Sequence, residues 1–257
     1  MADWNSAQYL RFKSQRTQPA IDLAAKISAE NPLEIIDIGC GPGNSTRVLK
    51  DRFPGANVTG ADSSENMLEA ARRENPDCKF IFLDAGGDLS ELAGKFDVVF
   101  SNACIQWVPD HEKLLPSLFS LMKRGGTLAV QIPVNFDEPI HKIIGEITSS
   151  GKWRAHFPNP RIFYTLTEGE YFDIISRLTD DFEMWKTIYC HRMADVESII
   201  EWYKSTGLKL YLDALSDADK EEFINDVRAE VEKAYPVREN GEIIFNFPRF
   251  FFTAKRS

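Results

Sequence analysis

The chain has few of the features that mark a secreted, membrane-bound or disulfide-linked protein. Its four cysteines, Cys40, Cys78, Cys104 and Cys190, lie far apart and form no Cys-x-x-Cys pair, which fits a reducing compartment. The first residues carry neither a cationic start nor an apolar run, and no apolar stretch approaches the length of a membrane span. We therefore expect a cytoplasmic protein with no membrane partner.

Two kinds of catalytic machinery are missing as well. The four histidines have no metal-ligand spacing relative to one another or to the cysteines, so we expect no metal. No Gly-x-Ser-x-Gly motif is present, which gives little support to hydrolase chemistry. The loops also show no obvious general base.

An excess of positive charge is the third absence. The chain carries 30 Lys and Arg against 39 Asp and Glu, a net charge of -9. Binding to nucleic acid is therefore not expected, and an anionic substrate would need a local basic pocket. The 257 residues are enough for one large domain, and we expect a single domain over 1–257 that acts as a monomer.

A glycine-rich loop is the most informative stretch that the chain does contain. Ile35, Ile36 and Ile38 are β-branched and predict a short buried strand. Three glycines follow within five residues, and a helical pattern begins at Asn44. Because glycine lets a backbone approach a ligand closely, this strand, loop and helix start predict a binding site across the loop.

The loop favours a nucleoside ligand without phosphate. The dinucleotide motif Gly-x-Gly-x-x-Gly needs a third glycine, and Asn44 stands in its place. Pro42 also removes a backbone donor that a pyrophosphate would use. S-adenosylmethionine is thus preferred to NAD, although an ordinary glycine-rich turn remains an alternative.

Acidic residues close the next two predicted strands. Asp62 follows the loop by the spacing at which a carboxylate meets the two hydroxyls of a ribose. An N-cap role for Asp62 in the next helix is the alternative, and both roles can hold together. Asp84 is a candidate acceptor for an adenine amino group, with capping or a turn as its alternative.

Strand and helix patterns alternate through the first half of the chain. This alternation predicts a doubly wound, mostly parallel α/β sheet whose ligands lie at the C-terminal strand ends. The glycine loop, Asp62, Asp84 and Asn102 all fall at that edge. The strands are expected near 34–38, 57–62, 79–84, 96–102 and 126–132, and the helices near 45–53, 64–74, 111–123 and 138–149.

The rest of the chain is expected to add a helical cap. Its two insertions are 135–160 and 195–235, and the sequence between and after them predicts a helix near 167–177 and strands near 180–192 and 242–255. A first helix is expected over 3–30. Lys123 and Arg124 suit the C-terminus of the fourth helix, with Gly125 and Gly126 closing it. His111 is expected to be exposed in the first turn of that helix.

The residues resemble a known family at this point. Ile36-Asp37-Ile38-Gly39-Cys40-Gly41-Pro42-Gly43, the two strand-end acids and Phe96-Asp97-Val98-Val99-Phe100-Ser101-Asn102 are similar to the ordered motifs of the Rossmann-like class I S-adenosylmethionine-dependent methyltransferases. The resemblance implies that fold and S-adenosylmethionine as the cofactor. The residues expected to bind it are Asp37, Gly39, Cys40, Gly41, Gly43, Asn44, Asp62, Ser63, Met67, Asp84, Ala85 and Asn102.

Further stretches imply a small anionic carboxylic acid as the methyl acceptor. They include Ile105-Gln106-Trp107-Val108-Pro109-Asp110-His111, Glu138-Pro139-Ile140-His141 and Phe247-Pro248-Arg249-Phe250-Phe251. A carboxylate is already ionised at neutral pH, since its pKa is roughly 4, so it needs no general base. Arginine forks and aromatic walls would hold the rest of the acid. The candidates are Tyr9, Arg11, Trp107, Trp153, Arg154, Arg161, Tyr164 and Arg249, with Arg192 as a further arginine.

Three other functions stay open on the sequence alone. The first is a methyltransferase whose acceptor is another small carboxylic acid, such as a dicarboxylic acid, or a malonyl group bound to an acyl carrier. A non-catalytic domain that binds and senses S-adenosylmethionine would show the same loop and acids. A dehydrogenase is the third, which the departure from the dinucleotide motif disfavours.

Overall fold

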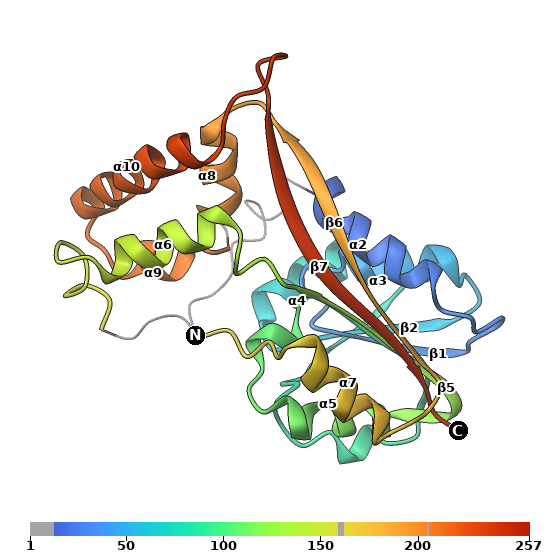
Figure 1. The fold of residues 1–257 in the computed structure, drawn as a ribbon. Helices are drawn as coiled ribbons and strands as arrows, with labels where there is room; N and C mark the ends of the chain where they lie inside the picture. Colours follow the sequence, from blue (N-terminus) through green and yellow to red (C-terminus); the bar gives the residue numbers. More distant parts are fainter. Residues whose placement is uncertain (1–12, 159–161, 205) are drawn as a thin grey trace. The chain divides into compact units, whose positions relative to one another are not determined.

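The computed structural model describes residues 13–158, 162–204 and 206–257, and it divides into two compact units (Figure 1). Unit 1 contains Val134–Ile162 and Ile188–Arg249. Unit 2 contains the described residues up to Pro133, together with Phe163–Thr187 and Phe250–Ser257. Each unit is described by itself.

A parallel sheet organises unit 2. Its five parallel strands are β1 (Glu34–Ile38), β2 (Asn57–Asp62), β3 (Lys79–Phe82), β4 (Phe96–Asn102) and β5 (Met122–Pro133), within the strand order β3-β2-β1-β4-β5-β7-β6. Asp37 pairs with Gly60 on one side and Phe100 on the other. Strand order reverses at β1, which places the ends of β1 and β4 beside each other. The predicted doubly wound sheet is confirmed.

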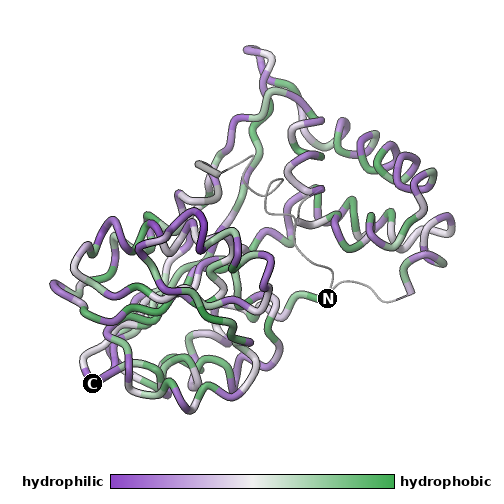
Figure 2. The backbone as a smooth tube through the Cα atoms, turned by 180° about the vertical axis from the view of Figure 1, so that it is seen from behind, coloured by the Kyte–Doolittle hydropathy of each residue, from purple (hydrophilic) through white to green (hydrophobic). Residues whose placement is uncertain are grey.

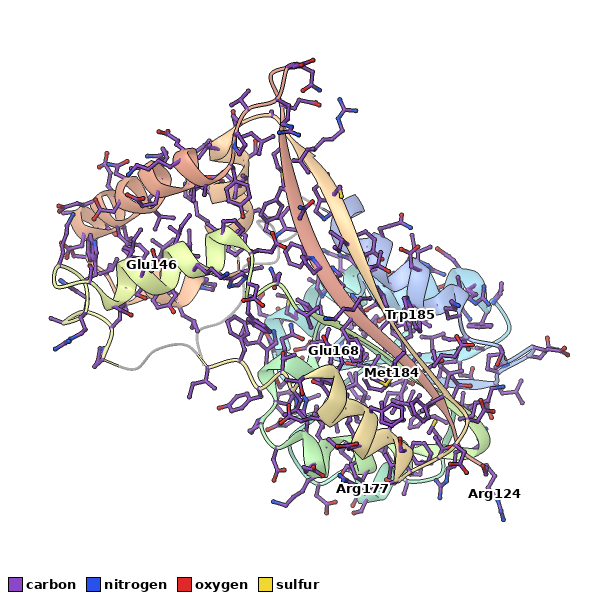
Figure 3. All side chains as sticks on the ribbon, viewed as in Figure 1. Arg124, Glu146, Glu168, Arg177, Met184 and Trp185 are labelled. Atoms are coloured by element: carbon purple, nitrogen blue, oxygen red, sulfur yellow. The ribbon has the colours of Figure 1, made fainter. Side chains whose placement is uncertain are left out.

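Two long strands complete the order on the β5 side. They are β6 (Phe182–Met193) and β7 (Ile243–Lys255). Gly125 N donates to Arg256 O, and Val134 N donates to Pro248 O, so β7 runs antiparallel to β5. Trp185 on β6, labelled in Figure 3, stacks on Phe251 of β7 with ring centroids 5.1 Å apart. The boundary between the units cuts both strands.

The central strands of unit 2 form its core. Ile35, Ile36, Val98, Val99 and Phe100 are fully buried, as a strand covered on both faces requires. Figure 2 shows hydrophobic stretches of backbone within the unit that holds this sheet. The helices of this unit are α2 (Lys13–Ala25), α3 (Asn44–Arg52), α4 (Glu65–Glu74), α5 (His111–Ser120) and α7 (Glu168–Ser176), with short 3-10 turns at Ser90–Leu92 and Ile105–Trp107.

Unit 1 contains helices that pack through aromatic side chains. They are α6 (Pro139–Ser149), α8 (Val196–Lys204), α9 (Lys209–Asp213) and α10 (Asp217–Ala234). Phe223 of α10 meets the rings of Trp153 and Phe157 at centroid distances of 5.1 and 5.4 Å. Ile140 N at the start of α6 donates to the Tyr235 hydroxyl. Both insertions predicted for the cap, 135–160 and 195–235, fall within this unit.

Several predicted boundaries were wrong. The first helix ends at Ala25 and not near residue 30. α5 ends at Ser120, and Lys123 instead belongs to β5, where its ammonium contacts Asp97 at 2.9 Å. The helical region predicted over 195–235 is confirmed as the three helices α8, α9 and α10, the last of which follows the Ser216 cap. Among the described residues, no helix combines the length and the apolar character that crossing a bilayer requires.

Candidate functional site

The glycine loop after β1 has a backbone shape that only glycine adopts easily. Gly39, Gly41 and Gly43 have φ values of 72°, 53° and 89°, in the left-handed region. A Cβ at position 39 would lie 2.2 Å from the Cys104 Sγ, so this residue must also lack a side chain. Gly39 N and Cys40 N both donate to Ala61 O, which anchors the loop to β2. The loop is therefore bare and fixed before any ligand arrives.

Asp37 lies buried beneath this loop. Its Oδ2 accepts hydrogen bonds of 2.7 Å from both the Ser45 and the Thr46 hydroxyl at the start of α3. Burial raises the pKa of Asp37 to about 6, although these two hydroxyls lower it. Its Oδ1 is buried and has no hydrogen-bond partner among the described residues. A buried carboxylate oxygen in that state is a site for a donor, above all for a cationic one.

Asp62 joins the end of β2 to the glycine loop. Its Oδ2 accepts from Gly41 N and its Oδ1 from Ser64 N, each at 2.9 Å. Burial raises the pKa of Asp62, against the lowering effect of these backbone donors. The N-cap of α4 is Ser64, whose hydroxyl accepts from Met67 N. The N-cap role considered for Asp62 is therefore wrong, whereas its role toward a ribose stays a prediction.

The remaining cofactor candidates lie around the same sheet edge. Asp84 is exposed, and its Oδ1 accepts from Gly86 N at 2.9 Å, the turn considered for it from the sequence. Asn44 Nδ2 and Asn102 Oδ1 are both buried and without a hydrogen-bond partner among the described residues. Met67 is buried on α4, Ala85 is half-buried and Ser63 is exposed.

These residues fit S-adenosylmethionine. Pro42 offers no backbone N–H in mid-loop, so a phosphate would find fewer donors there. Within the part of the chain that the structure describes, Asp37 Oδ1 and Asn102 Oδ1 accept from no donor, and an ammonium supplies donors. The bare loop leaves room for a ligand backbone to approach. The site thus suits a phosphate-free nucleoside with a charged amino group.

The loop after β4 lies against the glycine loop through Cys104 and Gly39. We call Ala103–Asp110 the β4–α5 loop. Its first and last residues, Ala103 and Asp110, have φ values of 55° and 57°, which is uncommon for residues other than glycine. Trp107, a predicted pocket wall, is half-buried, and its ring centroid lies 5.1 Å from that of Phe163.

The structure corrects the predicted exposure of His111 and shows a backbone contact of Tyr164 that the sequence did not indicate. His111 is 2 % exposed, so the expectation of an exposed histidine was wrong. Its Nδ1 contacts the Tyr171 hydroxyl at 2.7 Å, a partner sixty positions away that no local pattern reveals. Tyr164 is partly exposed, and its N donates to Gln106 O. The structure brings Trp107 and Tyr164 into the same part of unit 2.

Four of the predicted substrate residues lie elsewhere in the described structure. Arg249 is 4 % exposed in unit 1, with its guanidinium 4.5 Å from the Phe247 ring centroid. Burial and the Arg249 charge lower the pKa of His191 to about 4. Trp153 is buried, and its indole N–H donates to Asp226.

Arg154 is exposed, and Arg192 forms an exposed ion pair with Glu242. An exposed pair of this kind contributes little to stability. Tyr9, Arg11 and Arg161 lie outside the described residues, so their predicted roles stay predictions.

Comparison with protein families gives a match over the glycine loop and the sheet. Residues 35–126 match the family model described as "Methyltransferase domain". Curated proteins match over the full length. A trans-aconitate 2-methyltransferase from Methylobacterium radiotolerans is 41 % identical over 261 residues, covering 100 % of both chains. One from Enterobacter sp. is 42 % identical over 258 residues, covering 100 % of this chain and 99 % of the relative.

Solved structures confirm the fold. The YcgJ protein from Bacillus subtilis has a TM-score of 0.58 at 15 % identity and covers 95 % of this chain and 99 % of its own. Phosphoethanolamine N-methyltransferase 2 from Haemonchus contortus, in complex with S-adenosyl-L-methionine, has a TM-score of 0.55 at 19 % identity, with 93 % of this chain and 53 % of that chain covered. The chain thus has the Rossmann-like methyltransferase fold, and it belongs to the family of the trans-aconitate 2-methyltransferases.

Proposed function

We propose that the protein transfers a methyl group from S-adenosylmethionine to one carboxylate of trans-aconitate. The products are the monomethyl ester and S-adenosylhomocysteine. The observation that carries this proposal is the match to the trans-aconitate 2-methyltransferases at about 40 % identity, which extends over the full length of both chains. The glycine loop and its buried acids supply an independent physical reason for the cofactor.

The chain contributes mainly positioning and charge. Bound S-adenosylmethionine supplies a methyl group on a sulfonium, which an ionised carboxylate attacks without a general base. Asp37, which is buried, and Asp62, which is partly buried, would hold the cofactor, because such carboxylates favour donors and a positive charge. Trp107 and Tyr164 are proposed walls for the acceptor in unit 2.

Cationic groups would hold the carboxylates that are not methylated. Arg249 of unit 1 is one proposed cation, because its side chain is buried and its charge helps to keep the neighbouring His191 neutral. An arginine fork fits a carboxylate with two parallel hydrogen bonds. Arg154 of the same unit and the residues outside the described range, Tyr9, Arg11 and Arg161, remain candidates. Trp153 remains a candidate only for packing against the substrate, because its indole N–H already donates to Asp226.

An acceptor screen tests the proposal. The purified protein is incubated with S-adenosylmethionine and, in turn, trans-aconitate, cis-aconitate, citrate, another dicarboxylic acid and a malonyl acyl carrier. Mass spectrometry then measures the ester and S-adenosylhomocysteine in each reaction. We expect the highest kcat/KM with trans-aconitate. Turnover of another acid without turnover of trans-aconitate would refute the substrate while keeping the reaction class.

The same experiment distinguishes an enzyme from a non-catalytic domain that binds S-adenosylmethionine. Tight binding of S-adenosylmethionine without turnover of any acid would indicate a sensor domain.

We further propose that the protein acts in the cytoplasm as a monomer and has no nucleic-acid partner. The net charge of -9 supports the absence of a nucleic-acid partner. Sedimentation velocity at micromolar concentration tests the monomer directly.

A further inference from the structure

A chain of hydrogen bonds ties the β4–α5 loop to a segment far along the sequence. His111 Nε2 lies 2.9 Å from Ile105 O inside the loop, and Nδ1 lies 2.7 Å from the Tyr171 hydroxyl on α7. The same hydroxyl accepts from Leu166 N at 3.4 Å. A second link joins Tyr164 N to Gln106 O at 3.1 Å. We call Phe163–Thr167 the 163–167 segment.

The proton positions in this chain follow from the partners. A carbonyl oxygen only accepts, so His111 Nε2 must carry a hydrogen and donate to Ile105 O. In a neutral ring Nδ1 is then bare, and the Tyr171 hydroxyl must donate to it. Burial lowers the pKa of His111, which keeps this neutral form at neutral pH. One tautomer is therefore fixed by geometry.

The surroundings hold the pair rigidly. Tyr171 is fully buried and stacks on Phe250 with ring centroids 5.4 Å apart. The loop that the pair holds is strained, since its first and last residues, Ala103 and Asp110, adopt left-handed backbone. Strain of this kind persists only where neighbouring contacts over-determine it.

The clamped parts also carry signs of a ligand. Gln106 Oε1 and Thr165 Oγ1 are both buried and lack a hydrogen-bond partner among the described residues, and each belongs to one of the two joined elements. Buried polar atoms of this kind are normally satisfied by water or by a ligand. Trp107 and Phe163 form a ring pair beside them. Through Cys104 the same loop touches Gly39 of the cofactor loop.

We infer that His111 and Tyr171 are positioning residues that clamp the β4–α5 loop to the 163–167 segment, and so fix the acceptor-side wall next to the methyl donor. The inference rests on the proposed function, because it assigns the acceptor to this wall. Neither side chain touches the reacting atoms in this assignment. The pair acts through the placement of Gln106, Trp107 and Tyr164.

Acid is expected to weaken the clamp. Protonation puts a hydrogen on Nδ1, so the Tyr171 oxygen would face two donors, His111 and Leu166 N, and its own hydroxyl would lose its acceptor. Among the described residues, the charged groups acting on the pair are Asp110 beside His111, which favours protonation, and Glu170 beside Tyr171. The clamp is therefore complete above the ordinary histidine pKa and is lost only as the pH falls through the lowered pKa of His111.

Substitutions that keep the fold can dissect the clamp. Tyr171→Phe retains the ring stacking and removes the hydroxyl. His111→Gln can still donate to Ile105 O, whereas His111→Asn can reach only toward Tyr171. Tyr235→Phe is a matched control, since it removes another buried hydroxyl that accepts from a backbone N–H, that of Ile140.

The measurements are the dissociation constant of S-adenosylhomocysteine, kcat and KM for trans-aconitate from pH 5 to 8, and amide hydrogen exchange. We expect Tyr171→Phe and His111→Asn to lower kcat/KM for the acid about three- to tenfold, the effect of one lost hydrogen bond, with cofactor affinity unchanged within about twofold. His111→Gln should lose less, and both His111 variants should lack the acidic fall in rate that His111 causes. Tyr235→Phe should lose stability without these kinetic changes.

Amide hydrogen exchange tests the clamp without a measurement of enzymatic turnover. Tyr164 N and Leu166 N should exchange faster in Tyr171→Phe, while the amides of residues 37–46 stay unchanged. Unchanged exchange at both positions, or acceptor kinetics that match those of Tyr235→Phe, would overturn the clamp. A wild-type protein that fails to esterify trans-aconitate would refute the proposed function instead, and the exchange result would still decide the clamp.

Discussion

Replacing Asp62 by asparagine tests the cofactor site most directly. The substitution keeps the size of the side chain and converts one carboxylate oxygen to an NH2 group. Gly41 N and Ser64 N now donate to different oxygens of Asp62 at 2.9 Å each, and because an NH2 group cannot accept, one of these two hydrogen bonds is lost. The variant also loses the negative acceptor that we assign to the two ribose hydroxyls. The loop and the ligand are thus affected together.

The magnitude follows from these contacts. A hydrogen bond to a charged group contributes about 1.5–3 kcal/mol, so loss of the ribose contacts should weaken cofactor binding by about ten- to a hundredfold. The lower half of this range is expected, because burial raises the pKa of Asp62 and its ionised form already carries a desolvation penalty. Asparagine avoids that penalty and recovers part of the loss.

Calorimetry with S-adenosylhomocysteine measures the effect, and Asp97→Asn is the matched control. Asp97 Oδ2 accepts from Leu33 N and Glu34 N at 2.9 Å each, at the opposite edge of the same sheet. Both variants should lose thermal stability, but only Asp62→Asn should lose affinity. A dissociation constant within about twofold of the wild type for Asp62→Asn, or an equal loss in both variants, would refute the reasoning.

Three more outcomes are expected. Gly39→Ala should destabilise the folded protein more than Gly41→Ala. Both substitutions strain a positive φ, but only at position 39 would the new Cβ lie 2.2 Å from the Cys104 Sγ. Thermal denaturation compares the two variants, and equal losses of stability would contradict the clash. Burial raises the pKa of Asp37 to about 6, so between about pH 4 and pH 6 this group binds more protons in the native state than in the unfolded chain, and its contribution to stability is lost as the pH rises through that window. Affinity for the cationic cofactor should increase over the same window, because Asp37 becomes ionised. Asp37→Asn should flatten both pH profiles, as measured by denaturation and by calorimetry. Arg249→Lys should raise KM for trans-aconitate about tenfold at unchanged cofactor affinity, because lysine keeps the charge but not the fork; an unchanged KM would remove Arg249 from the acceptor site.

The sequence predicted the parallel sheet well because its signals are local. Each central strand is a short β-branched run, and the glycine loop that follows β1 has a shape that few other residues allow. Boundaries failed where a distant contact decides them. Lys123 looked like a helix C-terminus, yet its ion pair with Asp97 belongs to the strand that follows.

The site divides in the same way. The spacing of Asp62 after the glycine loop predicts a cofactor-binding edge, since parallel strand ends meet at one edge. Nothing local showed that His111 is buried, because its partner Tyr171 lies on another helix. The arginines could not be ranked either: Arg249 and Arg192 lie on neighbouring strands, and only the packing distinguishes the buried one from the exposed one.

The antiparallel pairing of β7 with β5 has a consequence for synthesis on the ribosome. The backbone of Gly125 and Gly126 pairs with Arg256, which the ribosome adds long after β5 itself has been made. Until then one side of β5 has no neighbouring strand, and a nascent chain with an open strand edge is prone to self-association. Protein from which β7 is deleted should therefore accumulate in inclusion bodies, although its glycine loop would be complete.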